Sequence, residues 1–215
     1  MKLSSVQVDD RIERYLESLL PPREPALERL ERELERERVP AIGPLVGQLA
    51  HLALRLAGSR DVLELGTAVG YSAIWLARGC SGRVVTLETD HERAERARAN
   101  LAEAALADRV NVVEEDALGY LEREQGRFDC VFNDLLNSFP DVGAVERCFE
   151  LSLGRLSPGG LLLADNALGR GEVVNPESRQ ARNITRYNEL VARTPGLESI
   201  IVPLRDGFSI ARLGS

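Results

Sequence analysis

The sequence has few cysteines, few aromatic residues, no long apolar run and no excess of positive charge. Only Cys80, Cys130 and Cys148 occur, an odd count with no Cys-x-x-Cys pair, which argues against a disulfide framework and a structural zinc site. Lys and Arg total 27 against 34 Asp and Glu, and the net charge of -7 without a basic cluster disfavours nucleic acid and membrane surfaces as partners. The N-terminal sequence MKLSSVQVDDRIERYLESLL becomes charged early, so we expect no signal peptide or membrane span and a cytoplasmic location.

Length and apolar content indicate a single domain over 1–215, because 215 residues with 44% hydrophobic content can bury one core. Residues 1–58 are predicted to form a helical N-terminal cap, with a break at Pro21-Pro22 and a last helix near 44–57. The charged run ERLERELERER is predicted to be a solvated helix face, supported by opposite charges four residues apart such as Arg29 and Glu33.

From residue 59 onward, short apolar segments alternate with helical ones. Strands are expected at 61–65, 83–88, 110–114, 128–133 and 160–164, and helices near 70–79, 91–106, 117–124, 141–156 and 177–193. This alternation predicts a doubly wound α/β core over 59–215 with a parallel sheet covered on both faces. LESIIVPL and GFSIARL, joined by Arg205-Asp206-Gly207, add a C-terminal antiparallel hairpin, giving a mostly parallel seven-stranded sheet.

Ligands of such sheets bind outside the carboxyl ends of the strands, so the residues that close each strand are candidate site residues. After the first strand, Gly66 and Gly70 allow a tight turn and a close approach of the backbone to a ligand. Ala68 stands where a dinucleotide fingerprint needs its second glycine. This disfavours an NAD-dependent oxidoreductase, which stays open as a rival.

Acidic residues close the second and third strands. Glu88 lies 22 residues after Gly66, where a carboxylate can accept hydrogen bonds from ribose hydroxyls. Asp116 and Ala117 place a carboxylate and a backbone N–H where a purine edge can lie, although Asp116 is equally suited to cap the next helix. Both roles remain open for Asp116.

The fourth and fifth strands end in Asp134 and in Asp165-Asn166, and these strands are expected to be neighbours. Two carboxylates and an amide oxygen would then converge, which is the ligand chemistry of a divalent cation such as Mg²⁺ or Ca²⁺. Two unrelated helix caps are the alternative. We favour the metal site for the set as a whole.

Several segments together resemble the class I, metal-dependent O-methyltransferases of the catechol and caffeoyl-coenzyme-A type, particularly the bacterial members. The matching segments span nearly the whole chain: PAIGP at 40–44, VLELGTAVGYSA at 62–73, TLETD at 86–90, DRVNVVEEDAL at 108–118, PGGLLLADN at 158–166 and DGFSIAR at 206–212. The resemblance implies a Rossmann-like methyltransferase fold, S-adenosylmethionine (SAM) as cofactor, a divalent metal, and a homodimer in which N-terminal helices help to cover the active site.

The resemblance also assigns roles to individual residues. Glu64, Gly66, Thr67 and Ser72 match the segment that holds the methionine part of SAM, Glu88 the ribose ligand, and Asp116 and Ala117 the adenine contacts. Further cofactor contacts fall on Ile42, Gly70, Tyr71, Thr89 and Asp134. The family's metal ligands fall on Asp134, Asp165 and Asn166, the three residues that the strand ends also select.

One segment departs from the family. Its members usually read Ile-Asp-Ala-Asp-Lys after the fourth strand, with the Lys deprotonating the acceptor hydroxyl, whereas this chain reads Asn133-Asp134-Leu135-Leu136-Asn137. An amide cannot accept a proton near neutral pH, so Asn137 can orient a hydroxyl but cannot serve as a general base.

The expected function is therefore metal-assisted methylation of a hydroxyl on a small acceptor with vicinal hydroxyls, with Asp134 and Asn137 as catalytic residues. The alternatives are a degenerate relative that keeps only SAM binding and a metal-independent methyltransferase with another acceptor. Residues 169–188, rich in polar and turn-forming residues, suit a loop over the substrate and an ordinary connection to a helix equally well.

Overall fold

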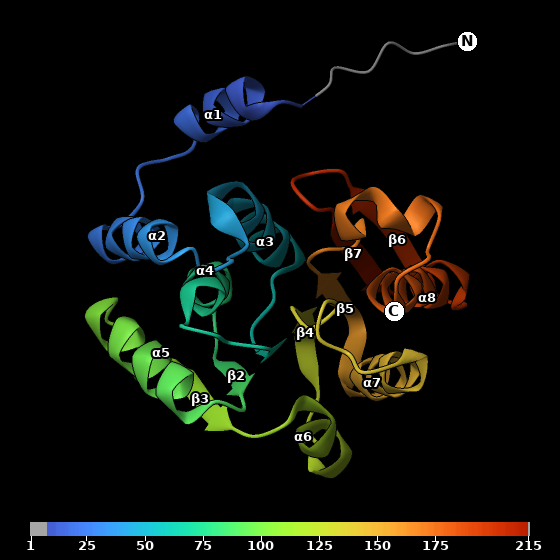
Figure 1. Cartoon of the computed structure of the whole chain (residues 1–215). Coiled ribbons are helices and arrows are strands. Elements are labelled where there is room, and N and C mark those ends of the chain that lie inside the picture. Colours follow the sequence, from blue (N-terminus) through green and yellow to red (C-terminus); the bar gives the residue numbers. More distant parts are fainter. Residues whose placement is uncertain (1–7, 215) are drawn as a thin grey trace.

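The structure, a computed structural model, describes residues 8–214 and contains one seven-stranded sheet (Figure 1). The first seven residues of the predicted helical cap and Ser215 lie outside the described residues. The strands are β1 (Val62–Leu65), β2 (Val84–Glu88), β3 (Val110–Glu114), β4 (Phe128–Asn133), β5 (Leu156–Ala164), β6 (Leu197–Val202) and β7 (Phe208–Leu213). Their order is β3-β2-β1-β4-β5-β7-β6, with β1 to β5 parallel and β7 antiparallel to both neighbours. The predicted sheet is confirmed.

The central strand β1 is buried along its whole length because its sequence, VLEL, is almost entirely apolar. Leu63 pairs with Val85 of β2 on one side and with Val131 of β4 on the other. Successive side chains of a strand point to opposite faces of the sheet. Leu63 therefore faces one core and Glu64 faces the other.

Helices cover both faces of the sheet (Figure 1). One core is shared by α2 (Pro25–Glu37), α3 (Gly43–Ala57), α4 (Tyr71–Gly79) and α5 (His91–Glu103). The opposite core is formed against α6 (Ala117–Arg123), α7 (Val142–Arg155) and α8 (Arg179–Arg193). Leu30 of α2 and Leu54 of α3 belong to the same core as Val62 of β1, so these N-terminal helices extend the core of the sheet.

The sequence predicted that the charged residues of α2 form a solvated face. In the structure some of them also form ion pairs with another helix. Arg29 forms the expected ion pair with Glu33 at 2.7 Å, but it also pairs with Glu103 of α5 at 2.7 Å. Glu37 pairs with Arg96 of α5 at 2.6 Å. The solvated face is present in exposed residues such as Glu35 and Arg36, but the prediction was incomplete, because helical periodicity does not reveal that a second charged helix lies alongside.

The helix α1 (Asp10–Ser18) lies apart from the body in Figure 1 and has no buried residue. Asp9 caps it by accepting hydrogen bonds from the backbone N–H groups of Arg11 and Ile12. Within residues 8–214, no helix has the length and apolar character needed to cross a membrane.

The boundary between α7 and β5 differs from the prediction. The helix ends at Arg155, and β5 begins at Leu156, which pairs with Phe128 before the register shifts. Pro158 cannot continue a helix, and Gly159 has a φ of 78°. The C-terminal hairpin is confirmed, with residues 203–207 connecting its strands.

Candidate functional site

The parallel strands β1 to β5 bring their carboxyl ends to one edge of the sheet, where two cavities lie. A cavity of about 290 Å³ is lined by Glu88, Asp116 and Leu135, among others. A cavity of about 480 Å³ is lined by Asp134, Asn137 and Asp165, among others. Asp134 and Leu135 are consecutive residues after β4, so this short segment contributes to the walls of both cavities.

The loop between β1 and α4 is a tight turn with left-handed backbone at three residues. Gly66, Ala68 and Gly70 have φ values of 97°, 45° and 85°. A Cβ at Gly66 would lie 2.9 Å from Leu135 Cδ2, and the φ of 97° would strain any other residue, so this position favours glycine. The predicted tight turn is present, and its close neighbour is the Leu135 side chain, so the approach of this backbone to a ligand stays a prediction.

Glu64 is fully buried at the end of β1, below this loop. Its Oε2 accepts a hydrogen bond of 2.5 Å from the hydroxyl of Thr86, its register partner on β2. Its Oε1 has no hydrogen-bond partner among the described residues. Burial raises the pKa of Glu64 to about 7. A buried carboxylate oxygen without a partner fits a ligand cation such as an α-ammonium group.

Two other residues of the predicted methionine-binding segment lie beside Glu64. Thr67 and Ser72 are both buried, and the Thr67 hydroxyl is hydrogen-bonded to that of Thr86. Tyr71 differs, because its hydroxyl donates a 2.8 Å hydrogen bond to Glu31 of α2. The Tyr71 side chain therefore ties α2 to the first turn of α4.

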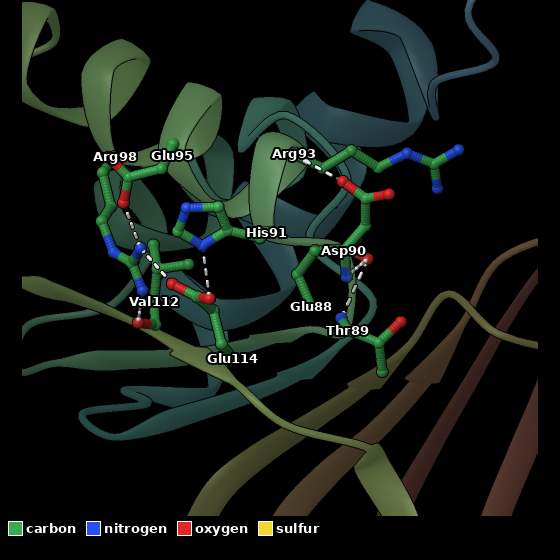
Figure 2. Close-up of polar contacts among 9 residues, drawn as sticks. All are labelled: Glu88, Thr89, Asp90, His91, Arg93, Glu95, Arg98, Val112 and Glu114. Atoms are coloured by element: carbon green, nitrogen blue, oxygen red, sulfur yellow. Dashed lines mark hydrogen bonds and ion pairs between the residues drawn. The ribbon is translucent and has the colours of Figure 1, made fainter.

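Glu88, at the end of β2, is held by three backbone N–H groups. Its Oε2 accepts from Ala68 at 2.9 Å, and its Oε1 accepts from Thr89 at 2.9 Å and from Asp90 at 3.0 Å. Figure 2 shows the two contacts at the turn that leads into α5. This arrangement fixes the carboxylate at the wall of the smaller cavity, where its remaining lone pairs suit ribose hydroxyls.

A charged cluster flanks this wall (Figure 2). His91 Nδ1 lies 2.8 Å from Glu114 Oε2, and Arg98 donates a 2.5 Å hydrogen bond to Glu114 Oε1. The Glu114 carboxylate raises the pKa of His91. These contacts join α5 to the end of β3 and involve none of the predicted site residues directly.

The rest of the smaller cavity is mainly apolar and suits a planar base. Asp116 caps α6 by accepting a 3.1 Å hydrogen bond from the backbone N–H of Gly119, which confirms its capping role. Ala117 and Thr89 also line the cavity. The remaining apolar walls come from the following residues: Leu87, Leu118, Leu135, Phe139 and Pro140.

The three predicted metal ligands lie together in the larger cavity. Asn133 of β4 pairs with Ala164 of β5, so Asp134 and Asp165 follow neighbouring positions of adjacent parallel strands. Burial and the nearby Asp165 raise the pKa of Asp134 well above its ordinary value. Burial also raises the pKa of Asp165 to about 6. The two carboxylates therefore oppose each other's ionisation unless a cation lies near both.

Asn166 completes this set with an amide, and its φ of 64° is a left-handed conformation that asparagine tolerates. Among residues 8–214, no three His, Cys, Asp or Glu side chains form a group that could hold a metal. The candidate cation site therefore depends on the Asn166 oxygen as well as two carboxylates. All three are hard oxygen donors, which suit Mg²⁺ or Ca²⁺.

Ile42 and Asn137 are also in the larger cavity, as their predicted roles require. The Asn137 amide oxygen accepts a hydrogen bond from the Gln180 side chain of α8. Residues 169–188 form η1 (Gly169–Val174) and the start of α8, and both Arg170 and Gln180 reach this cavity or its rim.

Two cationic residues of the larger cavity, Arg170 and Arg205, are absent from the sequence-based predictions. Arg205 Nη1 donates a 3.0 Å hydrogen bond to the carbonyl oxygen of Ala41. Its position in the hairpin connection was readable from the sequence, but its contact with residues 40–42 joins segments more than 160 positions apart. No local pattern signals such a contact.

A family model described as O-methyltransferase matches residues 23–213. A catechol O-methyltransferase of Mycobacterium tuberculosis is 34% identical over 93% of this chain and 94% of its own length. A catechol O-methyltransferase of Niastella koreensis is 29% identical over 95% of this chain and 97% of its own length. Both similarities extend over nearly the full length of each protein.

Solved structures are also similar. An O-methyltransferase from Bacillus cereus in complex with SAH has a TM-score of 0.83 and is 32% identical, covering 94% of this chain and 97% of that one. An O-methyltransferase from Streptomyces achromogenes in complex with SAM has a TM-score of 0.80 and 31% identity, covering 95% of this chain and 96% of that one.

Proposed function

Because the chain belongs to the O-methyltransferase family, we propose that it transfers the methyl group of SAM to a hydroxyl of a small acceptor with vicinal hydroxyls, assisted by a divalent cation. SAM-dependent O-methyl transfer is the activity of the family. The observation that carries the finer proposal is the convergence of Asp134, Asp165 and Asn166 in one cavity beside the pocket of Glu88.

The chain's residues are suited to holding SAM across the two cavities. The unpartnered Glu64 Oε1 would accept hydrogen bonds from the α-ammonium group, and Glu88 would hold the ribose hydroxyls. The apolar walls around Ala117 would enclose the adenine. SAM supplies a methyl group on a positively charged sulfur, so an acceptor oxygen that attacks this carbon breaks the carbon–sulfur bond and leaves a neutral thioether. The protein's task is alignment of oxygen, carbon and sulfur.

Asp134, Asp165 and Asn166 would hold the divalent cation, which supplies the positive charge that lowers the pKa of the acceptor hydroxyls. Asn137 would orient one hydroxyl through its amide, which Gln180 positions. Asn137 has no basic lone pair for the proton, so the hydroxyl proton passes to solvent before or during transfer. This favours acceptors whose hydroxyls are already acidic.

Methyl transfer from labelled SAM to a panel of catechols and acidic enols, before and after exhaustive chelation, tests the proposal. We expect activity to disappear on chelation and to return with Mg²⁺. Asp165→Asn should lower kcat/KM at least ~100-fold, because cation charge contributes several kcal/mol to such reactions. Asp108→Asn, at an exposed acid away from both cavities, is the control. Undiminished turnover after chelation, or methylation of amines alone, would overturn the proposal.

We also propose that a second copy of the chain covers the N-terminal helices. Tyr15 and Leu19, on and just after α1, are 60% and 63% exposed, and Leu56 of α3 is 87% exposed. Such side chains on neighbouring helices favour burial against a partner surface. Sedimentation velocity should give a dimer for the native chain and a monomer for Leu19→Glu with Leu56→Glu. A monomer for the native chain at micromolar concentration would contradict this.

A further inference from the structure

Two arginines of the larger cavity have a backbone conformation that favours glycine. Arg170 and Arg205 have φ values of 54° and 50°, and both line the cavity that holds Asp134 and Asp165. A residue with a β-carbon is strained in this region, so a side chain found there needs a compensating reason. Arg38, at the end of α2, has a φ of 56° but lies outside this cavity.

The guanidinium of Arg205 has a fixed place at the mouth of the cavity. Its Nη1 donates to the Ala41 carbonyl oxygen at 3.0 Å, and its Nε lies 3.9 Å from Glu13 of α1. A Cβ at Gly43 would overlap this guanidinium, so glycine at that position leaves the space that Arg205 fills. The side chain is thereby held at the cavity while several of its N–H donors remain free.

Arg170 is held by its backbone, and its guanidinium is free. Its backbone N–H donates a 2.5 Å hydrogen bond to Asp206 Oδ1, which fixes the turn that presents the side chain. Arg170 is an exposed residue at the cavity, and within residues 8–214 its backbone N–H, but not its guanidinium, is hydrogen-bonded to another residue. A cation in a cavity with no protein partner is available to a ligand anion.

The charges of the cavity favour a ligand with one negative charge. With a divalent cation balancing Asp134 and Asp165, the remaining charged residues that line this cavity are Arg170, Arg205 and Asp206. Glu13, which lies 3.9 Å from Arg205, lines the neighbouring cavity instead, so the lining of this one carries one excess positive charge. The other lining residues are short or neutral, namely Pro40, Ala41, Ile42, Asn137 and Asn166. A carboxylate matches this excess better than a phosphate, which carries about -1.5 to -2 charges at pH 7.

We propose that Arg170 and Arg205 bind a carboxylate of the acceptor, so that the substrate class is a small acid with vicinal hydroxyls. This inference rests on the proposed function, since it deepens the identity of the acceptor at the same site. Arginine presents planar pairs of N–H donors that match a carboxylate. The carboxylate would anchor the end of the acceptor that lies away from the cation, and so choose which hydroxyl faces the methyl group.

Steady-state kinetics with 3,4-dihydroxybenzoate and catechol, which differ by the carboxylate, test the inference. We expect the native enzyme to favour the acid in kcat/KM by about 10- to 100-fold, which corresponds to one or two charge-assisted hydrogen bonds. Arg170→Gly and Arg205→Gly should each bring this ratio toward one. Both variants relieve a strained backbone and should keep the native Tm. Arg38→Gly removes an arginine of the same conformation elsewhere and should leave the ratio unchanged.

Calorimetry separates this inference from the proposed function. With SAH and Mg²⁺ present, 3,4-dihydroxybenzoate should bind the native protein about 10-fold or more tightly than catechol, and Arg205→Gly should remove that difference. If neither compound is methylated, the proposed function fails, and the binding ratio still decides the inference. Equal affinity and equal kcat/KM for the two compounds, or tighter binding of catechol phosphate than of the acid, would overturn it.

Discussion

The buried carboxyl of Glu64 should link the stability of the free protein to its affinity for the cofactor. Burial raises its pKa from the ordinary value of 4.5 to about 7. Between these two pH values the folded protein keeps a proton that the unfolded chain releases. The stabilising protonated state is fully present below pH 4.5, and its contribution is lost as the pH rises through 7. From pH 5 to pH 8 this loss amounts to about 2–3 kcal/mol.

Glu64→Gln removes the ionisable group and keeps an oxygen that can accept from Thr86. Urea unfolding of the native protein and of this variant, without cofactor at pH 5 and pH 8, isolates the contribution of Glu64 to the free energy of unfolding. The other titrating groups are the same in both proteins. The free energy of unfolding of the variant, relative to the native protein, should increase by about 2–3 kcal/mol between these pH values. A difference that stays constant within about 0.5 kcal/mol would refute the reasoning.

Cofactor binding should favour the ionised form of the Glu64 carboxyl, whereas folding of the free protein favours the protonated form. An ionised Glu64 attracts the α-ammonium group, so binding of SAH should release a proton from Glu64 near pH 6. At pH 6 only about one carboxyl in ten is ionised in the free protein, so the native Kd should fall about 10-fold by pH 8. Calorimetry in two buffers of different ionisation enthalpy measures both effects. The Glu64→Gln variant should bind SAH more weakly than the native protein. It should also lack the part of the proton release and of the change in Kd between pH 6 and pH 8 that Glu64 causes.

Three further substitutions test separate parts of the account. Asn137→Lys should raise kcat on catechol at least ~10-fold by supplying a general base, and an unchanged kcat would show that deprotonation does not limit the reaction. Gly66→Ala should lower the free energy of unfolding by about 1–3 kcal/mol in urea titrations, because φ is 97° and the new Cβ would lie 2.9 Å from Leu135. Tyr187→Phe should leave stability unchanged or raise it by up to about 1 kcal/mol, since its buried hydroxyl has no partner in residues 8–214. A clear loss in Tyr187→Phe would reveal a bound water.

The central sheet, and the acidic residues at the carboxyl ends of its strands, could be predicted because both follow from short-range patterns in the sequence. Buried parallel strands are continuous apolar runs, as in the segment of Leu63, and each run ends where the backbone leaves the core. Neighbouring strands then bring their end residues together. The pairing of Asn133 with Ala164 places Asp134 and Asp165 side by side, as the strand order required.

The two arginines of the larger cavity, Arg170 and Arg205, could not be predicted as site residues, because their positions depend on contacts between distant segments. Arg205 reaches the cavity through its hydrogen bond to Ala41, and Arg170 through the turn held by Asp206. Neither residue lies at a strand end or within a periodic pattern. The pairing of Arg29 with Glu103 has the same cause, since it depends on how two charged helices pack.

A crystal structure with SAH and Mn²⁺ tests the central claim most directly, because the anomalous signal of Mn²⁺ locates the cation independently of the refined atoms. The account predicts Mn²⁺ within about 2.0–2.4 Å of oxygens of Asp134, Asp165 and Asn166, and the SAH ribose on Glu88. It is contradicted by a Mn²⁺ peak elsewhere with this cavity empty, or by SAH bound away from Glu64 and Glu88.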